Sequence, residues 1–547
     1  MANVSHPTRA AASQRCLCLI TVAIALQGCA GDADDGSPEP SPAPCQSSQP
    51  WPYPPGIPYA GIHAGPRNDD YVDCDTATAF SLTWHALHGK GLIQPNTFSP
   101  DGATVYATTT SAEAEGCRLH ALDAATGALR WCRPGHPSLA AGSVLVDEDG
   151  HLYVAEEATI LSLTPSGDVR WRATVPYEGQ TGLLSGLIGL HFSRGGHVLT
   201  VDGRGVIHAV SRAEGRVVGS LSIPDAFGFE DLSEVGTSIP LLNLFPQAIR
   251  DDFVRTMGSA AEANLFLSGF LGFGGEFSDN TITVGPDGSL YVVGGGPTPS
   301  NGALVQVRTS ETPEAVVMTP GWYVATVGGS AATPSISGDG QFIVISDGAA
   351  ADNFLNPLPA HAILIDVRAC DRNEDGDPAP SICDPIYLLP LERGAMAGSP
   401  AILSGGEVIF WELGSDLGES EPGSRDVAGF GPEGLRWELS LPEGFDWTSI
   451  ITVSRTHFWG TMSRITPSSR SVLRFRIPQA VEHALVVVDR STREVVFTHP
   501  IPDDSAATVT IGPDGALYVG MLGLVSHFAL DQRPTLGLLR FSPQSGP

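Results

Sequence analysis

Lysine is nearly absent from this sequence, in which Lys90 is the single lysine among 30 basic residues. These basic residues stand against 60 acidic ones, so the formal net charge is −30 at pH 7. A surface of this charge repels phosphate backbones, and we therefore expect no binding to nucleic acid. The lack of lysine also argues against chemistry that forms a Schiff base on a lysine side chain.

Sequence signatures of common enzymes are also missing. The chain has no Gly-x-Ser-x-Gly elbow of a serine hydrolase and no His-Glu-x-x-His motif of a zinc protease. Its 15 histidines are scattered, and the closest two, His85 and His88, would point to opposite faces of a continuing strand. These patterns favour a non-catalytic protein over any class of enzyme.

Only one apolar run stands out, and it lies at the N-terminus. Cys16–Leu26 follows a basic start and is too short to span a bilayer comfortably, which is typical of an export signal. The next residues, Leu26-Gln-Gly-Cys29, resemble a lipobox, where bacterial signal peptidase cuts before a diacylated cysteine. We expect a signal peptide over 1–28 and a lipid on Cys29. The alternative is an ordinary cleaved signal peptide that leaves Cys29 free.

This N-terminus predicts an exported lipoprotein, anchored in a membrane and facing the periplasm or the cell surface. Ala30 stands where enteric bacteria use Asp to retain lipoproteins in the inner membrane, so the outer membrane is favoured. Residues 29–60 are rich in Pro, Ser, Asp and Gly, and we expect them to form a lipidated flexible tether. The folded body is expected over 61–547.

Cysteine usage agrees with export. Of nine cysteines, Cys16 and Cys18 leave with the signal peptide, and Cys29 carries the lipid. The other six fall into neighbouring pairs: Cys45 with Cys74, Cys117 with Cys132, and Cys370 with Cys383. In an oxidising compartment we expect these six to form three disulfides, although the sequence does not fix their connectivity.

One short unit recurs along the chain: an apolar strand, a tight turn with Gly, and a second strand. Asp-Gly and Gly-Gly pairs tolerate the positive φ angles that a two-residue hairpin turn needs. The turns stand at Asp101-Gly102, Asp149-Gly150, Gly195-Gly196, Asp287-Gly288, Asp339-Gly340, Gly405-Gly406 and Asp514-Gly515, with a degraded copy around Arg455-Thr456. Eight copies at intervals of about 46 to 66 residues, apart from one wide gap, predict an all-β fold: one eight-bladed β-propeller of four-stranded antiparallel blades.

The second half of each unit carries a family resemblance. Leu119–Trp131 and Ile160–Trp171 share one Gly-to-Trp spacing, and weaker copies end at Trp437 and Phe497. This pattern resembles the quinoprotein-like (PQQ-like) repeat, whose unit ends A-x-D-x-x-T-G-x-x-x-W. The resemblance implies a propeller and says little about function. We interpret the tryptophans as packing between blades.

The two ends of the folded body complement each other. The chain stops after Leu538–Gly546, where the repeat expects a turn and a tryptophan strand, and Ala79–His85 supplies such a strand near the other end. We expect this N-terminal strand to complete the last blade and close the ring. In the wide gap, about 227–276, the apolar spacing predicts a helix over Ala248–Phe266, which is either a loop packed on the rim or a lid or docking element.

One acidic loop resembles the calcium loops of EF-hand and thrombospondin type-3 segments. Oxygen ligands stand there at alternate positions, namely Asp371, Asn373, Asp375 and Asp377. The loop departs from the EF-hand pattern at the twelfth position, which is Ile382 instead of Glu. Two interpretations stay open: a structural calcium ion, or a solvated acidic turn.

A further segment, Ile62–Asp70, resembles the H-x-x-x-x-N stretch that often precedes this repeat type. We expect it to pack across a propeller face, with a ligand role for His63 or Asn68 as the alternative. The fold suggests a quinone-dependent dehydrogenase, but the chain has no Cys-Cys pair, and the calcium-binding and catalytic residues of that family have no matched positions. We therefore expect no pyrroloquinoline quinone (PQQ) and carry over no catalytic residue.

Two functional classes remain. The first is a membrane-displayed monomeric propeller that binds an envelope protein or an extracellular polymer without catalysis. It resembles, in anchor and fold class, the propeller lipoprotein of the outer-membrane β-barrel assembly machinery. The second is an enzyme, either a divergent quinoprotein oxidoreductase or a hydrolase that uses the central funnel. Clustered acids and a perturbed histidine in the funnel would favour the enzyme.

Overall fold

The computed structural model describes residues 45, 49–110, 117–134, 142–177, 186–229, 241–261, 263–264, 267, 280–298, 301–327, 330, 332–347, 360–372, 380–391, 394–395, 399–414, 426–442, 444–472, 475–505 and 507–544. The expected signal peptide, 1–28, and the expected lipid site, Cys29, lie outside these residues. Within the described ranges, no helix is both long and apolar enough to cross a membrane.

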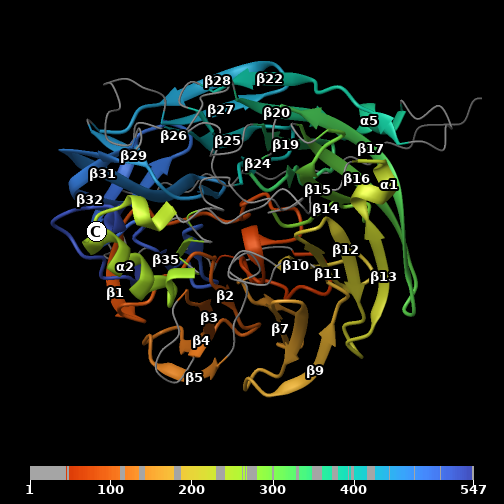
Figure 1. The fold of residues 1–547 in the computed structure, drawn as a ribbon, viewed down its shortest axis with the longest axis horizontal. Helices are drawn as coiled ribbons and strands as arrows, with labels where there is room; N and C mark the ends of the chain where they lie inside the picture. Colours follow the sequence, from red (N-terminus) through yellow and green to blue (C-terminus); the bar gives the residue numbers. More distant parts are fainter. Residues whose placement is uncertain are drawn as a thin grey trace, which may run out of the picture. The chain divides into compact units, whose positions relative to one another are not determined.

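Eight antiparallel sheets follow one another around a ring within the compact unit Ser41–Pro547 (Figure 1). Blade 1 consists of β2 (Thr97–Phe98), β3 (Thr104–Thr108), β4 (Cys117–Asp123) and β5 (Leu129–Pro134), and blade 2 of β6 (Leu145–Val146), β7 (Leu152–Glu156), β8 (Thr159–Leu163) and β9 (Val169–Thr174). Blade 3 consists of β10 (Leu187–Phe192), β11 (Val198–Asp202), β12 (Val206–Val210) and β13 (Val217–Ser222). Blade 4 consists of β14 (Thr283–Val284), β15 (Leu290–Gly295), β16 (Gly302–Glu311) and β17 (Val316–Thr326), with β21 (Ser381–Ile382) added at the edge.

Blade 5 consists of β18 (Ser335–Ile336), β19 (Phe342–Ser346), β20 (His361–Asp366) and β22 (Tyr387–Pro390), and blade 6 of β24 (Ala401–Ile402), β25 (Val408–Trp411), β27 (Val427–Gly431) and β28 (Gly434–Leu439). In blade 7, β29 (Phe445–Trp447) and β30 (Thr452–Val453) both pair with β31 (His457–Val472), which is followed by β32 (Phe475–Asp489) and β33 (Val495–Ile501). Blade 8 consists of β34 (Thr510–Ile511), β35 (Leu517–Met521), β36 (Gly537–Pro543) and β1 (Phe80–Ala86). The described chain also has the small sheet β23 (Gly394–Ala395) with β26 (Leu413–Gly414), and the helices η1 (Ile62–Ala64), α1 (Ile223–Phe227), η3 (Leu241–Leu244), α2 (Gln247–Met257), α5 (Val367–Arg372) and α6 (Leu524–His527). The predicted eight-bladed propeller is confirmed.

The N-terminal strand closes the ring, as the sequence predicted. β1 runs antiparallel to β36, with Phe80 opposite Pro543 at one end and Ala86 opposite Leu538 at the other. The outermost strand of blade 8 therefore comes from the start of the folded body, and the other three come from its end. Pairing the two ends leaves no sheet edge open at the junction.

Tryptophans join neighbouring blades through the turn between the third and fourth strands. The Nε1 atom of Trp84 donates to the carbonyl of Ala124 at 3.2 Å, and Trp171 donates to the carbonyl of Arg212 at 3.0 Å. Trp131 makes the equivalent contact with Pro165 at 3.1 Å. The Trp84 ring leaves no room for a side chain at Gly127, because a Cβ there would lie 2.8 Å from the ring. This contact explains the Gly-to-Trp spacing, and it confirms that these tryptophans pack between blades.

The wide gap between blades 3 and 4 holds the expected helix with a break at Gly258, after which the described residues 260–261, 263–264 and 267 are helical again. α2 ends at Met257 because Gly258 takes a left-handed conformation there, with φ of 93°. Ile249, Phe253 and Met257 are buried as predicted, whereas Ala261 is exposed. This apolar face packs on residues of blades 7 and 8, namely Ile477, Leu522, Leu524 and Phe528. α2 follows blade 3 in the sequence but packs on blades 7 and 8, which lie beyond blade 1 in the ring.

A polar contact also holds α2 in place. Asp252 accepts a hydrogen bond from Nδ1 of His527 at 2.9 Å, and both side chains are buried. His527 belongs to α6, in the connection between the second and third strands of blade 8. α2 therefore packs on α6 of blade 8 and on Ile477 of β32 in blade 7.

Part of the predicted tether is folded. Gln49–Ala60 lies among the described residues, and Tyr53, Ile57 and Tyr59 are buried in the same core cluster as the strands of blades 1 and 2. Tyr53 packs edge-on against Phe192 of blade 3, with ring centroids 5.0 Å apart. The structure differs from the expected boundary here, because scattered aromatic residues in a Pro-rich stretch find partners in blades far away in the sequence.

Candidate functional site on the propeller axis

The segment Tyr59–Asp70, here called the axial segment, is bonded to the innermost strands of six blades. Its carbonyl oxygens accept hydrogen bonds from one backbone N–H of each strand, at distances of 2.7 to 3.2 Å. The pairs, written donor to acceptor, are Phe98 to Tyr59, Val146 to Ala60, Val284 to Pro66, Ile336 to Arg67, Ile402 to Asp69 and Val453 to Asp70. Just before this segment, the hydroxyl of Tyr53 accepts from the N–H of Phe192, which adds blade 3.

The six donors occupy one position of the repeat, the residue before the first turn of each blade. The innermost strand of a blade has an unpaired edge, and a buried N–H without a partner destabilises the fold. The axial segment supplies the missing acceptors around the ring. Its own backbone therefore lies inside the ring, bonded to the innermost strands of these six blades.

The axial segment adopts a backbone that sequence patterns do not reveal. His63, Ala64, Asn68 and Asp70 have positive φ values of 52°, 66°, 50° and 44°. Each such residue other than glycine costs about 1–2 kcal/mol, and strained positions of this kind cluster where the surroundings fix the backbone. Here the bonds to the blades fix it.

Polar side chains of this segment form a buried cluster. His63 contacts Asp70 through Nδ1, at 2.9 Å from Oδ2, and Ser399 of the sixth blade through Nε2, at 3.0 Å from Oγ. The Tyr59 hydroxyl donates to Asp70 Oδ1 at 3.4 Å. Burial raises the pKa of Asp70, and the neighbouring His63 acts against that rise. Burial also raises the pKa of Tyr59.

The contacts of His63 and Asp70 have the connectivity of a Ser-His-Asp triad. With Asp70 accepting from Nδ1, the Nε2 atom of His63 can accept the Ser399 proton. Ser399 is only 1% exposed, however, so in this conformation a substrate does not reach its hydroxyl. The chemistry that the arrangement performs here is to hold the axial segment against blade 6.

The expectation that His63 and Asn68 pack across the propeller is confirmed. Asn68 donates through Nδ2 to the Thr283 hydroxyl at 2.8 Å and to the Ile282 carbonyl at 3.0 Å, both in blade 4. Its Oδ1 atom is buried without a hydrogen-bond partner, which suits a bound water. A second buried histidine, His191, lies 3.1 Å from the Tyr53 hydroxyl, and burial lowers its pKa to about 3.

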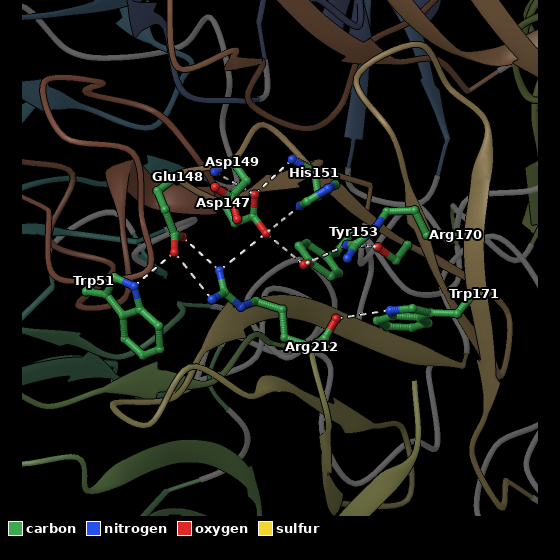
Figure 2. A network of polar contacts seen from close by, with 10 residues as sticks. Trp51, Asp147, Glu148, Asp149, His151, Tyr153, Arg170, Trp171 and Arg212 are labelled. Atoms are coloured by element: carbon green, nitrogen blue, oxygen red, sulfur yellow. Dashed lines mark hydrogen bonds and ion pairs between the residues drawn. The ribbon is translucent and has the colours of Figure 1, made fainter. Parts of the chain in front are cut away.

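A second candidate site lies at the first turn of blade 2, where Asp147, Asp149 and His151 gather as metal ligands would (Figure 2). Donors from the protein already surround Asp147. Its Oδ1 accepts from the N–H groups of Asp149 and His151 at 3.0 and 2.8 Å. Its Oδ2 accepts from the Tyr153 hydroxyl at 2.8 Å and from Arg212 at 3.3 Å.

The sequence analysis did not identify this cluster, although the repeat holds a signal for it. Asp147 stands where Ser99 and Ser337 close the corresponding turns of blades 1 and 5 through their hydroxyls. Like those serine hydroxyls, the Asp147 carboxylate accepts hydrogen bonds from backbone N–H groups of the turn, and it also binds Arg212 of blade 3. A metal ion would have to displace these donors, so the geometry is that of a turn and a link between blades.

The predicted calcium loop is described only in part. Asp371 lies in α5, and its Oδ1 accepts from Trp322 Nε1 at 3.0 Å and from Gln306 Nε2 at 3.1 Å. This oxygen is therefore engaged with blade 4. Asn373, Asp375 and Asp377 lie outside the described residues, so the calcium site remains a prediction.

All three expected disulfides are present: Cys45–Cys74, Cys117–Cys132 and Cys370–Cys383. The prediction that His85 and His88 point to opposite faces applied to a continuing strand, and in the structure their rings lie 3.8 Å apart. β1 ends at Ala86, and Leu87 has a φ of 54°, so the strand alternation on which that prediction depended stops between the two histidines.

Comparison with known proteins supports the repeat type. The family described as outer membrane protein assembly factor BamB matches residues 80–239. This range holds the closing strand and blades 1 to 3, with the tryptophan contacts described above. The described chain is a β-propeller, and its residues 80–239 are similar to this family. No match was found among curated proteins.

Solved structures with the same fold are distant in sequence. Quinohemoprotein alcohol dehydrogenase from Comamonas testosteroni is 12% identical, with a TM-score of 0.52 over 89% of this chain and 82% of that one. BamB from Moraxella catarrhalis is also 12% identical, with a TM-score of 0.33 over 87% of this chain and 96% of that one. At such identity the first likeness shows the fold alone, and the second adds no argument.

The residues on the axis do not fit a quinone cofactor. A cofactor enclosed by the ring would need the central channel. In the described part of the chain, Tyr59–Asp70 lies there and is bonded to the innermost strands of six of the eight blades. No chemical step through PQQ is therefore derived.

Proposed function

We propose that this protein is an exported lipoprotein whose propeller serves as a non-catalytic binding scaffold in the cell envelope. The observation that carries the proposal is the axial segment. A ring whose channel is filled by its own backbone offers its faces and rim to partners, and these surfaces suit a protein or an extracellular polymer. The family description, an outer membrane protein assembly factor, supports a role in protein binding.

The anchor is the second part of the proposal. The lipobox-like residues before Cys29 support a lipid on that cysteine, and Ala30 favours the outer membrane. Cys45 begins the described chain and is tied to Cys74. The 16 residues from Cys29 to Cys45 reach at most about 55 Å when fully extended, so the ring stays close to the membrane that holds the lipid.

Site-specific photo-crosslinking in intact cells tests the scaffold. A photoreactive amino acid is placed at Leu244 beside α2, at Leu129 on the rim of blade 1, or at Val317 on β17, all of them exposed. We expect one envelope partner to be captured from one of these surfaces and not from the others. Amine-reactive reagents are unsuitable because Lys90 is the single lysine. Failure to capture a partner at all three positions, with the protein abundant and anchored, would contradict the proposal.

A hydrolase that uses the axis is the second candidate, and the contacts of Ser399, His63 and Asp70 favour it. A fluorophosphonate probe distinguishes the two functions, because it reacts with an activated serine and not with an ordinary one. We expect no labelling of the native protein, since Ser399 is buried. Labelling that is lost in Ser399→Ala would establish the hydrolase instead.

A further inference from the structure

The disulfide Cys45–Cys74 brackets the segment that closes the channel. Its two Cα atoms lie 5.1 Å apart, although the cysteines are 29 positions apart in the sequence and the axial segment between them passes across the innermost strands. The loop between the two cysteines contains the axial segment and Tyr53. The start and the end of this loop are therefore covalently joined at one place on the ring.

Cys74 is fixed to blade 7 and leads directly into the closing strand. Its carbonyl accepts from the N–H of Arg455 at 3.2 Å, and two residues later the N–H of Thr76 donates to the Thr456 hydroxyl at 3.3 Å. β1 then begins at Phe80 and pairs with β36 along its full length. A pull on Cys74 along the chain loads these strand bonds in shear, so that many of them resist together.

The axial segment would resist such a pull far less. A pull that entered at Gln49 would meet the bonds of Tyr53, Tyr59 and Ala60 first and those of Asp70 last. Bonds loaded one after another break at low force, because each carries the whole load in turn. Each also contributes only about 0.5–1.5 kcal/mol.

We propose that the Cys45–Cys74 disulfide is a force bypass that carries tension from the chain before Cys45 past the axial segment into Cys74 and β1. This inference rests on the proposed function for the source of tension, which is the lipid anchor. In an oxidising compartment the channel then stays closed while the anchor is under load. Both cysteines are buried, Cys45 to 1% and Cys74 to 3% exposure, so a dithiol reaches the disulfide only when the surrounding chain opens. The dithiol then forms two cysteine thiols and becomes a disulfide itself, and the same tension withdraws the axial segment.

Single-molecule stretching tests the bypass. One handle is attached at the N-terminus of the mature chain and the other at exposed Leu129 through an unnatural amino acid. In Cys45→Ala/Cys74→Ala we expect an early step at low force, with a length of about 100 Å for the 29 released positions at about 3.5 Å each. The native protein should lack this step. Cys117→Ala/Cys132→Ala is the matched control, because it removes a disulfide within blade 1, and it should behave like the native protein.

A second measurement remains useful if the double variant does not fold. The native protein is held at constant force, and a dithiol is added. We expect one step of about 100 Å that requires the dithiol and is retained in the blade 1 control. The inference is overturned if the native protein shows the early step without a dithiol, or if neither the variant nor the reduced protein shows it. Because the instrument supplies the force, this result is independent of the anchor, which mass spectrometry of Cys29 tests separately.

Discussion

Arg212 of blade 3 donates a hydrogen bond from Nη1 to Oε2 of Glu148 of blade 2 at 2.7 Å (Figure 2). The same guanidinium contacts the buried Asp147 at 3.3 Å and lies 5.0 Å above the ring of Trp51. One side chain thus joins two blades and the N-terminal stretch that leads to the axis. Since Asp147 is buried, these donors replace the water that its carboxylate loses on folding.

We predict that Arg212→Ala lowers the free energy of unfolding by about 2 kcal/mol, because it leaves the buried Asp147 without its cationic partner. Arg216→Ala is the control: Arg216 and Glu214 are both exposed and 3.5 Å apart, so the loss should stay below about 0.5 kcal/mol. Urea denaturation of both variants measures the difference. Equal losses would show that Arg212 does not link the blades.

A second prediction concerns the contact between tryptophan and turn. Gly215 and Gly228 share a φ of 68°, but a Cβ on Gly215 would lie 2.6 Å from the Trp171 ring, whereas Gly228 has nothing within 4 Å. Gly228→Ala should cost about 1 kcal/mol for the backbone alone. Gly215→Ala should cost about 2 kcal/mol more, because the ring must move. The free energies of unfolding of the two variants test this prediction. Similar values would mean that the Trp171 ring moves away from position 215 without loss of stability.

The third prediction is a pH dependence from His191, whose pKa burial lowers from 6.5 to about 3. Between these values the unfolded chain binds a proton that the folded chain does not, so stability decreases as the pH falls from 6.5 towards 3. Replacing His191 by Gln removes this titration. The free energy of unfolding of native protein minus variant should therefore fall by about 1.4 kcal/mol for each pH unit below 6.5. A constant difference between pH 4 and pH 7 would show that His191 is accessible to solvent.

The fourth prediction concerns the acidic loop at Asp371. If calcium orders it, saturating calcium should stabilise the native protein by about 2–3 kcal/mol at a concentration 100 times the dissociation constant, and a chelator should reverse this. Asp375→Asn/Asp377→Asn should abolish the effect. Asp149→Asn, in the turn of blade 2, should retain it. The same thermal midpoint with calcium and with chelator would favour the solvated acidic turn.

The blades could be predicted from the sequence because their signals are local. The turn at Asp101-Gly102 and the spacing from Gly127 to Trp131 each lie within one hairpin. The closing strand followed from the repeat, because the last unit lacks a tryptophan strand that Ala79–His85 supplies. These patterns were sufficient for the number of blades and for the closing strand. The helix in the gap was recognised, but its break at Gly258 was not.

The axial segment could not be predicted in the same way. Its bonds join Tyr59 to Phe98 and Asp70 to Val453, and no local pattern records which strands lie around an axis. His63 and Asn68 have positive φ values that their residue types tolerate, but residue type alone does not predict them. The triad-like contact with Ser399, 336 residues away from His63, has no sequence motif for the same reason.

Amide hydrogen exchange at the six axial donors tests the central claim, a channel closed by the chain itself, most directly. The amides are those of Phe98, Val146, Val284, Ile336, Ile402 and Val453. If the axial segment accepts from them as described, they should exchange as slowly as the amides within the blades, such as Tyr153 of β7. Exchange of these six within seconds, beside a protected Tyr153, would show an open, water-filled channel and contradict the account.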